Sequence, residues 1–125
     1  MKLNYDSSAL VLDSKLKVLI LENTRGWRIE IQLRANEDSS FTLVAMSGIH
    51  SKPAELSKLQ GPYESRQQAC AARHAIAIQL LDKGFKQIEH EHSIWNLQAQ
   101  KAIQKVREQR TLNRGNYDFH PDDVL

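Results

Sequence analysis

The segment W-R-I-E-I-Q-L-R, residues 27–34, alternates apolar and polar side chains without a break. Successive side chains of a β-strand point to opposite faces of a sheet, so this pattern predicts a strand with one buried and one polar face. We expect the polar face to be open to solvent, as in an antiparallel sheet that is covered on one side. This polar face contains Arg28, Glu30, Gln32 and Arg34.

Two further segments have the composition of strands. Residues 15–22 alternate and then become apolar on both faces, and residues 41–46 follow the turn-forming residues 35–40. The apolar pattern of residues 9–12 is too short to decide between a fourth strand and the start of a helix. Glycine and proline punctuate residues 47–64, which we expect to form a loop.

Two helices are predicted after the strands. The first spans about residues 66–83, because Ser65 is a good N-cap, Gln68 completes a capping box, and Gly84 stands where a left-handed glycine ends a helix. The second spans about residues 94–110. Its apolar stripe has helical spacing and consists of Trp95, Ala99, Ala102, Ile103 and Val106.

Strands followed by helices indicate the α+β class. We therefore predict an antiparallel sheet of three to four strands that is covered on one face by two helices. A chain of 125 residues is the size of one domain, and we expect this domain to span residues 1–110. Residues 111–125 contain three aspartates and no aliphatic run, which favours a flexible acidic tail.

Charge, cysteine content and apolar runs limit the class of protein. The net charge is +2, and the single cysteine excludes a disulfide within the chain. The longest apolar run, residues 18–21, is too short to span a membrane, and the N-terminal residues lack the apolar core of a signal peptide. We therefore expect a cytoplasmic protein that does not bind membranes.

Cys70 and His74, four residues apart in the first predicted helix, form the most enzyme-like pair in the sequence. A catalytic thiolate needs a lowered pKa, access to solvent and nearby oxyanion donors. A helical projection places Cys70 in the middle of the apolar arc and His74 at its edge, which favours core packing. Because no phosphate-binding loop or catalytic motif is present, the sequence supports neither an enzymatic activity nor a cofactor.

The segment I-E-H-E-H-S, residues 88–93, contains His90 and His92 at a spacing that binds metal on a strand. Zinc sites use three or four ligands, and the other histidines have no motif spacing. A solvated linker between the two helices is the alternative interpretation, and we assign no metal ligand.

Basic residues form the candidate binding surface. Residues 93–115 contain five Lys and Arg against one Glu, and Arg66 and Arg73 share the apolar arc of the first helix. An arginine in this position either extends over apolar surface toward solvent or a carboxylate such as Glu22 or Glu30, or forms a basic binding edge. The candidate set comprises Arg28, Arg34, Arg66, Arg73, Lys101, Lys105, Arg107 and Arg110.

Together these features predict a small non-catalytic binding domain, a protein-interaction or adaptor module. Its partner would be an unknown protein or a second copy of the chain, bound at the open sheet face or at the second helix with its tail. The alternative is a nucleic-acid-binding module that uses the basic second helix and the arginines of the sheet face, because lysine and arginine neutralise phosphates.

Residues 27–85 resemble the WGR domain in the order of their segments. These are W-R-I-E-I-Q, then F-T-L-V-A-M-S-G-I-H-S-K, then a capped helix that ends L-L-D-K-G-F. That family is a small sheet-plus-helix module, some of whose members contact DNA ends. At the position of the family's Trp-Gly-Arg signature this chain has Met46, Ser47 and Gly48, so both the tryptophan and the arginine are missing.

Overall fold

The computed structural model describes residues 17–50, 52–89, 92–108 and 121–125. Its elements are β1 (Val18–Glu22), β2 (Trp27–Ala35), β3 (Phe41–Ile49), β4 (Leu56–Tyr63), α2 (Arg66–Asp82), β5 (Lys86–Gln87), α3 (Asn96–Glu108) and the 3-10 helix η2 (Pro121–Val124). The strands form one antiparallel sheet in the order β4-β3-β2-β1-β5. No helix among these residues is both long enough and apolar enough to cross a membrane.

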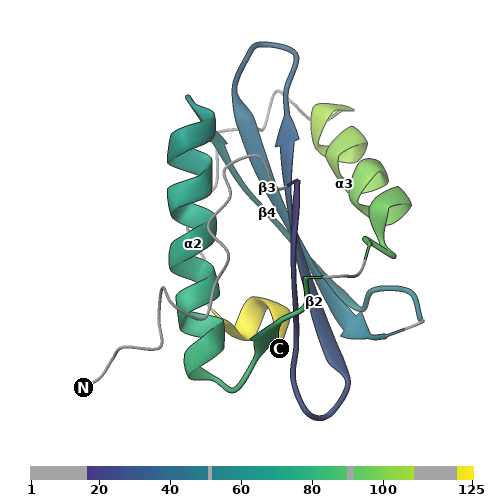
Figure 1. The fold of residues 1–125 in the computed structure, drawn as a ribbon. Helices are drawn as coiled ribbons and strands as arrows, with labels where there is room; N and C mark the ends of the chain where they lie inside the picture. Colours follow the sequence, from purple (N-terminus) through teal and green to yellow (C-terminus); the bar gives the residue numbers. More distant parts are fainter. Residues whose placement is uncertain (1–16, 51, 90–91, 109–120) are drawn as a thin grey trace.

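The α+β class is as predicted, but the number of strands and the placement of the helices differ from the prediction. The sheet has five strands rather than three or four, because part of the expected loop 47–64 forms β4 and a short β5 follows α2. The two helices do not share one face: α2 and α3 lie on opposite sides of the sheet (Figure 1). Residues 9–12 lie outside the described residues.

The central strand β2 sets the register of the sheet. It pairs with β1 through Ile31 and Leu19, and with β3 through Ile31 and Ala45. The turn between β1 and β2 is closed by Asn23, whose side-chain oxygen accepts hydrogen bonds from the backbone N–H groups of Arg25 and Trp27, at 3.0 and 2.9 Å. Asparagine commonly stabilises a turn in this way.

The main apolar core lies between α2 and the sheet. The alternation of β2 buries the side chains of Ile29, Ile31 and Leu33 on this face, as the sequence predicts. The other core residues come from β1, β3, α2 and the segment after it, and include Leu21, Leu43, Ala69, Ile76, Ala77, Leu80 and Phe85. Alanine at positions 69 and 77, fully buried, allows α2 to lie close to the strands.

Helix α2 begins and ends at the predicted signals. The Ser65 side chain accepts a hydrogen bond from the backbone N–H of Gln68 at 3.1 Å. The Gln68 side chain reaches back to the N–H of Glu64 rather than to that of Ser65, which modifies the predicted capping box. Gly84 has φ of +96°, and Phe85 donates to the Leu80 carbonyl at 3.1 Å, which is the Schellman pattern.

The last described segment, Pro121–Leu125, packs against the same face of the sheet as α2. Val124 is completely buried in the main core, and its carbonyl accepts a 2.7 Å hydrogen bond from the Trp27 indole N–H. In Figure 1 the yellow η2 segment lies between α2 and the sheet. Val124 therefore belongs to the core and not to a free tail, while residues 111–120 of the expected tail lie outside the described residues.

Two glycines in left-handed backbone conformations allow a direct test of this fold. Gly61 has φ of +125°, and a Cβ there would lie 3.0 Å from the Phe41 carbonyl oxygen, whereas a Cβ on Gly84 would meet nothing within 4 Å. Gly84→Ala should therefore lower the free energy of unfolding by about 1 kcal/mol, from backbone conformation alone. Gly61→Ala adds a backbone clash and should cost at least about 2 kcal/mol. Equal losses in urea denaturation would contradict the close approach of β3 and β4 at Gly61.

Candidate functional site

The face of the sheet that α3 covers carries a row of hydrogen-bonded polar side chains along β2, here called the polar ladder: Arg28, Glu30, Gln32 and Arg34. Neighbours in this row are two residues apart, so they point to the same face. Arg28 Nε donates to Glu30 at 3.1 Å, Gln32 Nε2 donates to Glu30 at 3.4 Å, and Arg34 Nη2 donates to Gln32 at 2.7 Å. Arg28 and Glu30 are completely buried.

The Glu30 carboxylate joins the polar ladder to the segment that leads into α3. One oxygen accepts from the Ser93 hydroxyl at 2.6 Å, and the other accepts from the Ile94 backbone N–H at 2.8 Å. The neighbours of Glu30 across the strands are Ile20 and Met46, both buried, so the carboxylate lies in apolar surroundings. A buried carboxylate is stable only when charge and hydrogen bonds compensate it, and here both are supplied.

The Arg28 guanidinium supplies the compensating charge. Its Nη2 lies 3.0 Å from Glu30 and donates to the His92 carbonyl at 2.8 Å. Its Nη1 lies 3.6 Å from the Glu22 carboxylate, which in turn lies 3.0 Å from His50 Nδ1. Arg28 thus connects two carboxylates with the backbone that precedes α3.

Arg34 connects the outer end of the polar ladder to the first residue of α3. Its Nη2 donates to the Asn96 side-chain oxygen at 2.6 Å. Burial lowers the pKa of the Arg34 guanidinium below its ordinary value, because the charged form loses contact with water. Both hydrogen-bond acceptors named here, Gln32 and Asn96, are neutral side chains.

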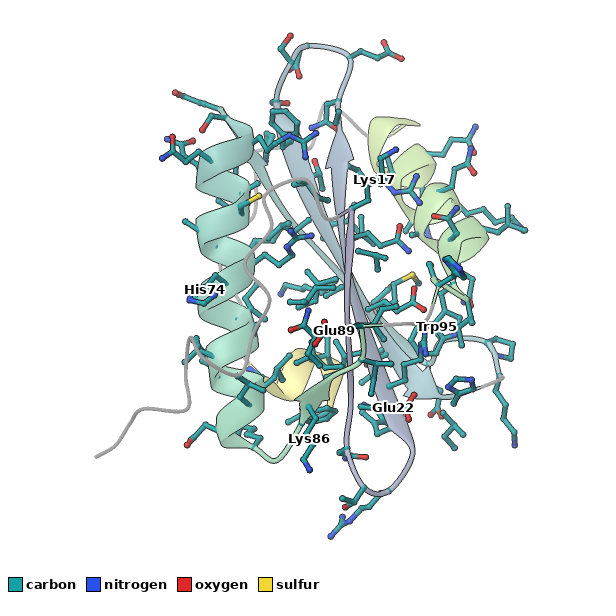
Figure 2. All side chains as sticks on the ribbon, in the orientation of Figure 1. Lys17, Glu22, His74, Lys86, Glu89 and Trp95 are labelled. Atoms are coloured by element: carbon teal, nitrogen blue, oxygen red, sulfur yellow. The ribbon has the colours of Figure 1, made fainter. Side chains whose placement is uncertain are left out.

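A second, smaller apolar cluster completes the contact between α3 and the sheet. It consists of Val44, Met46, Trp95, Ala99 and Ile103, with Ala54 and Leu59 at its edge. The Trp95 indole donates to the Lys52 carbonyl at 2.7 Å. Figure 2 labels Trp95 on the α3 side of the sheet and His74 on α2, on the other side. Helix α3 therefore packs on the sheet of its own domain, a point that the sequence alone leaves open.

The prediction of an open polar sheet face is wrong. The polar side chains of β2 are where the alternation places them, but α3 and residues 92–95 cover them. Arg28 is completely buried and therefore does not belong to an exposed binding surface, while Arg34 is partly exposed. The sequence pattern distinguishes the two faces of the strand but not a solvated face from a hydrogen-bonded buried one.

The other predicted surface residues do not lie together. Arg66 is exposed at the start of α2, with its guanidinium 5.3 Å from the centre of the Phe41 ring. Arg73 is 5% exposed and belongs to the covered side of α2, so a basic edge at this residue is contradicted. Lys101 and Lys105 are exposed on α3, across the sheet from Arg66. The side chain of Arg107 and all of Arg110 lie outside the described residues.

The outward side of α3, together with the residue before Trp95, forms what we call the outer α3 surface: Ile94, Leu97, Lys101 and Lys105. Leu97 is 64% exposed and Ile94 is 42% exposed. Residues 97, 101 and 105 are four apart, so they share one side of the helix, opposite the buried Ala99 and Ile103. Sequence reasoning missed both apolar residues. The available signal was that Leu97 falls outside the apolar stripe of the helix.

Cys70 and His74 both lie in α2, as predicted. Cys70 is partly buried and packs against the main core, as predicted for a structural thiol. His74 Nδ1 is buried, with no hydrogen-bond partner among the described residues. A nucleophile would need a base that is itself oriented by a third group, and no described residue orients the His74 ring through Nδ1.

The histidines near the α3 segment give no metal cluster in the part of the chain that the structure describes. No group of three or more His, Cys, Asp or Glu there could hold a metal ion. His90 lies outside the described residues, and His92 is exposed. His50 is oriented by Glu22 at 3.0 Å, so its ordered partner is a carboxylate.

Comparison with known proteins gives a family. A family model described as "PA4575-like protein" matches residues 1–123. The chain belongs to the PA4575-like protein family. This description names no activity, substrate or partner, and neither the curated proteins nor the solved structures yielded a match. The resemblance of segment order to the WGR domain stays a resemblance.

The buried ion pair between Arg28 and Glu30 can be tested by mutation. Glu30→Gln keeps the shape of the side chain but removes the negative charge 3.0 Å from the buried Arg28, whereas the Glu22 carboxylate lies farther away, at 3.6 Å. Because removing one partner of a buried ion pair leaves an uncompensated charge, the free energy of unfolding should fall by about 3 kcal/mol. The same change at the exposed Glu37 should alter it by less than about 0.5 kcal/mol. Similar small effects of both substitutions in urea denaturation would contradict the buried ion pair.

Proposed function

We propose that this protein is a small protein-interaction module and that its outer α3 surface is the contact site. The observation that carries the proposal is the exposure of Leu97 on the same side of α3 as Lys101 and Lys105, with Ile94, also exposed, three residues before it in the chain. Among the described residues, these two are half of the four large hydrophobic side chains that are exposed. Scattered single apolar residues need no explanation, whereas neighbouring ones often mark a binding surface.

The charges of this surface indicate the chemistry of the partner. Lys101 and Lys105 follow Leu97 along the same side of α3, and Lys52, also exposed, belongs to the loop whose carbonyl holds Trp95. An exposed apolar side chain followed by lysines complements an acidic protein surface that has an apolar recess. Complementary charge raises the rate of association and excludes wrong partners, while the apolar residue supplies affinity.

The polar ladder supports the proposal because it fixes α3 before any partner binds. Ser93 and the Ile94 backbone N–H donate hydrogen bonds to Glu30, and the Asn96 side chain accepts one from Arg34, so the start of α3 is attached to β2. A contact surface that is already ordered loses less conformational entropy on binding than a flexible one. A buried polar network adds little net stability compared with an apolar core of the same volume, but it can define a single position for the helix.

The nucleic-acid alternative has less support from the arrangement of basic residues. It relied on Arg28 and Arg73, which are buried, and on Arg66, which lies across the sheet from the lysines of α3. A phosphate backbone is bound by several basic side chains on one continuous surface. We therefore treat nucleic-acid binding as an outcome of the test below. A chain with a single cysteine forms no disulfide within itself, which supports the proposal of a reducing, cytoplasmic location.

The proposal predicts that a photo-crosslinking amino acid at position 97 captures a protein partner in living cells. The same group at Gln79, an exposed residue on α2, is the matched control and should not capture it. With the captured protein purified, Leu97→Asp should weaken binding at least tenfold, because a charge replaces the central apolar contact. The free energy of unfolding should change by less than about 0.5 kcal/mol, since Leu97 is exposed.

Two results would contradict this function. Equal capture at positions 97 and 79 would show that the outer α3 surface has no preferred partner. Capture that disappears after nuclease treatment, with binding that falls steeply as salt rises, would assign the surface to nucleic acid instead.

A further inference from the structure

Arg34 is held in one orientation by hydrogen bonds to uncharged oxygens. Its Nε and Nη2 donate to the Gln32 side-chain oxygen at 3.0 and 2.7 Å, and Nη2 also donates to the side-chain and backbone oxygens of Asn96, at 2.6 and 3.3 Å. All of these acceptors are amide oxygens. The fold therefore orders the guanidinium, but these contacts do not neutralise its charge.

The orientation of Gln32 follows from the buried part of the polar ladder. Its Nε2 donates to Glu30 at 3.4 Å and to the Ser93 hydroxyl at 3.0 Å. Because the amide nitrogen makes these two contacts, the amide oxygen is directed toward Arg34. The buried Glu30 carboxylate therefore determines, through Gln32, how the Arg34 guanidinium is oriented.

The two arginines of the polar ladder differ in their surroundings. Arg28 is completely buried and lies 3.0 Å from the Glu30 carboxylate and 3.6 Å from that of Glu22. Arg34 is partly exposed, and partial loss of contact with water lowers the pKa of its guanidinium. A guanidinium that is ordered, partly desolvated and bonded to neutral groups is suited to a carboxylate ligand, because its planar N–H groups match the two carboxylate oxygens.

The position of Arg34 relates it to the outer α3 surface. Asn96, which accepts hydrogen bonds from Arg34 Nη2, is the first residue of α3 and precedes Leu97, which is 64% exposed. Lys101 and Lys105 follow Leu97 on the same side of the helix. A basic group is thus bonded to the start of α3, before Leu97, and two lysines come after it.

We propose that Arg34 binds a carboxylate side chain of the protein partner, next to the apolar contact that Leu97 makes. This inference rests on the contact site proposed above and adds a residue that determines specificity. The partner must carry an aspartate or glutamate beside the apolar side chains that meet Leu97. Within the described part of the chain Nε and Nη2 make the bonds given above, so the carboxylate would be bound at Nη1.

The substitution Asn96→Asp tests this inference without removing the guanidinium. It places a carboxylate of the same shape where the amide oxygen lies 2.6 Å from Arg34 Nη2, so Arg34 acquires a counter-charge within the chain. An acidic residue in the first turn of a helix is favourable, so the midpoint of urea denaturation should not fall. Gln79→Glu, at an exposed residue of α2, adds the same charge on the other side of the sheet and is the matched control.

Sodium hexanoate is the probe, because it joins a carboxylate to an aliphatic chain, and hexanamide is its neutral counterpart. In ¹H–¹⁵N NMR spectra of the full chain, hexanoate should shift the Arg34 Nε–H signal, with half-saturation on the order of 10 mM for so small a ligand. Hexanamide, or sodium chloride at the same concentration, should not reproduce the shift. Asn96→Asp should raise the half-saturation concentration at least about fivefold, and Gln79→Glu should leave it unchanged.

Three results of this titration would overturn the proposal. The first is a wild-type Arg34 signal that shows no saturable response to hexanoate. The second is an equal response to hexanamide, or an equal response of the Asn96→Asp chain to hexanoate. The third is half-saturation below about 0.1 mM, which would indicate a site for a small carboxylic acid instead of a protein side chain.

Binding of the partner captured at position 97 separates this inference from the proposed function. Both are supported if Leu97→Asp and Asn96→Asp each weaken binding at least about fivefold while Gln79→Glu does not. If only Leu97→Asp weakens binding, the contact site stands and the role of Arg34 is wrong. If position 97 captures no partner, the contact site fails, and the hexanoate titration still decides whether Arg34 binds carboxylates.

Discussion

The buried Glu30 carboxylate is the interaction on which the arrangement of the molecule depends. It neutralises Arg28, which is also completely buried, and it accepts hydrogen bonds from Ser93 and from the backbone of Ile94. An apolar contact between a helix and a sheet tolerates sliding, whereas these directional bonds define one position. We infer that the ion pair determines where α3 lies, which in turn determines which side of α3 faces outward.

The two faces of the sheet are stabilised by different physical effects. On the α2 side, burial of large aliphatic side chains dominates, and Val124 adds to that core from a distant part of the chain. On the α3 side the apolar cluster is small, and hydrogen bonds of the polar ladder attach the start of α3 to β2. The proposed contact site follows from this division, because the polar ladder orients the outer α3 surface.

The sequence predicted the local elements better than their assembly. Alternation in β2, the Ser65 cap and the left-handed Gly84 depend on neighbouring residues, and each is found where predicted. Strand β4 was missed because its sequence, LSKLQGPY, contains the glycine and proline that usually mark loops. The burial of Arg28 could not be predicted, since it depends on which face of the sheet receives α3. The exposure of Leu97 had a signal in the sequence, its place outside the apolar stripe of the helix, but was missed.

Hydrogen exchange at the Ile94 amide tests the central claim most directly. Its N–H donates to the Glu30 carboxylate at 2.8 Å, although the Ile94 side chain is exposed and the residue precedes α3. If the buried ion pair holds α3 on the sheet, this amide should be protected nearly as well as the amides in the middle of β2. Exchange at the rate of an unstructured peptide would show that the segment before α3 is not attached to Glu30 and would contradict the account.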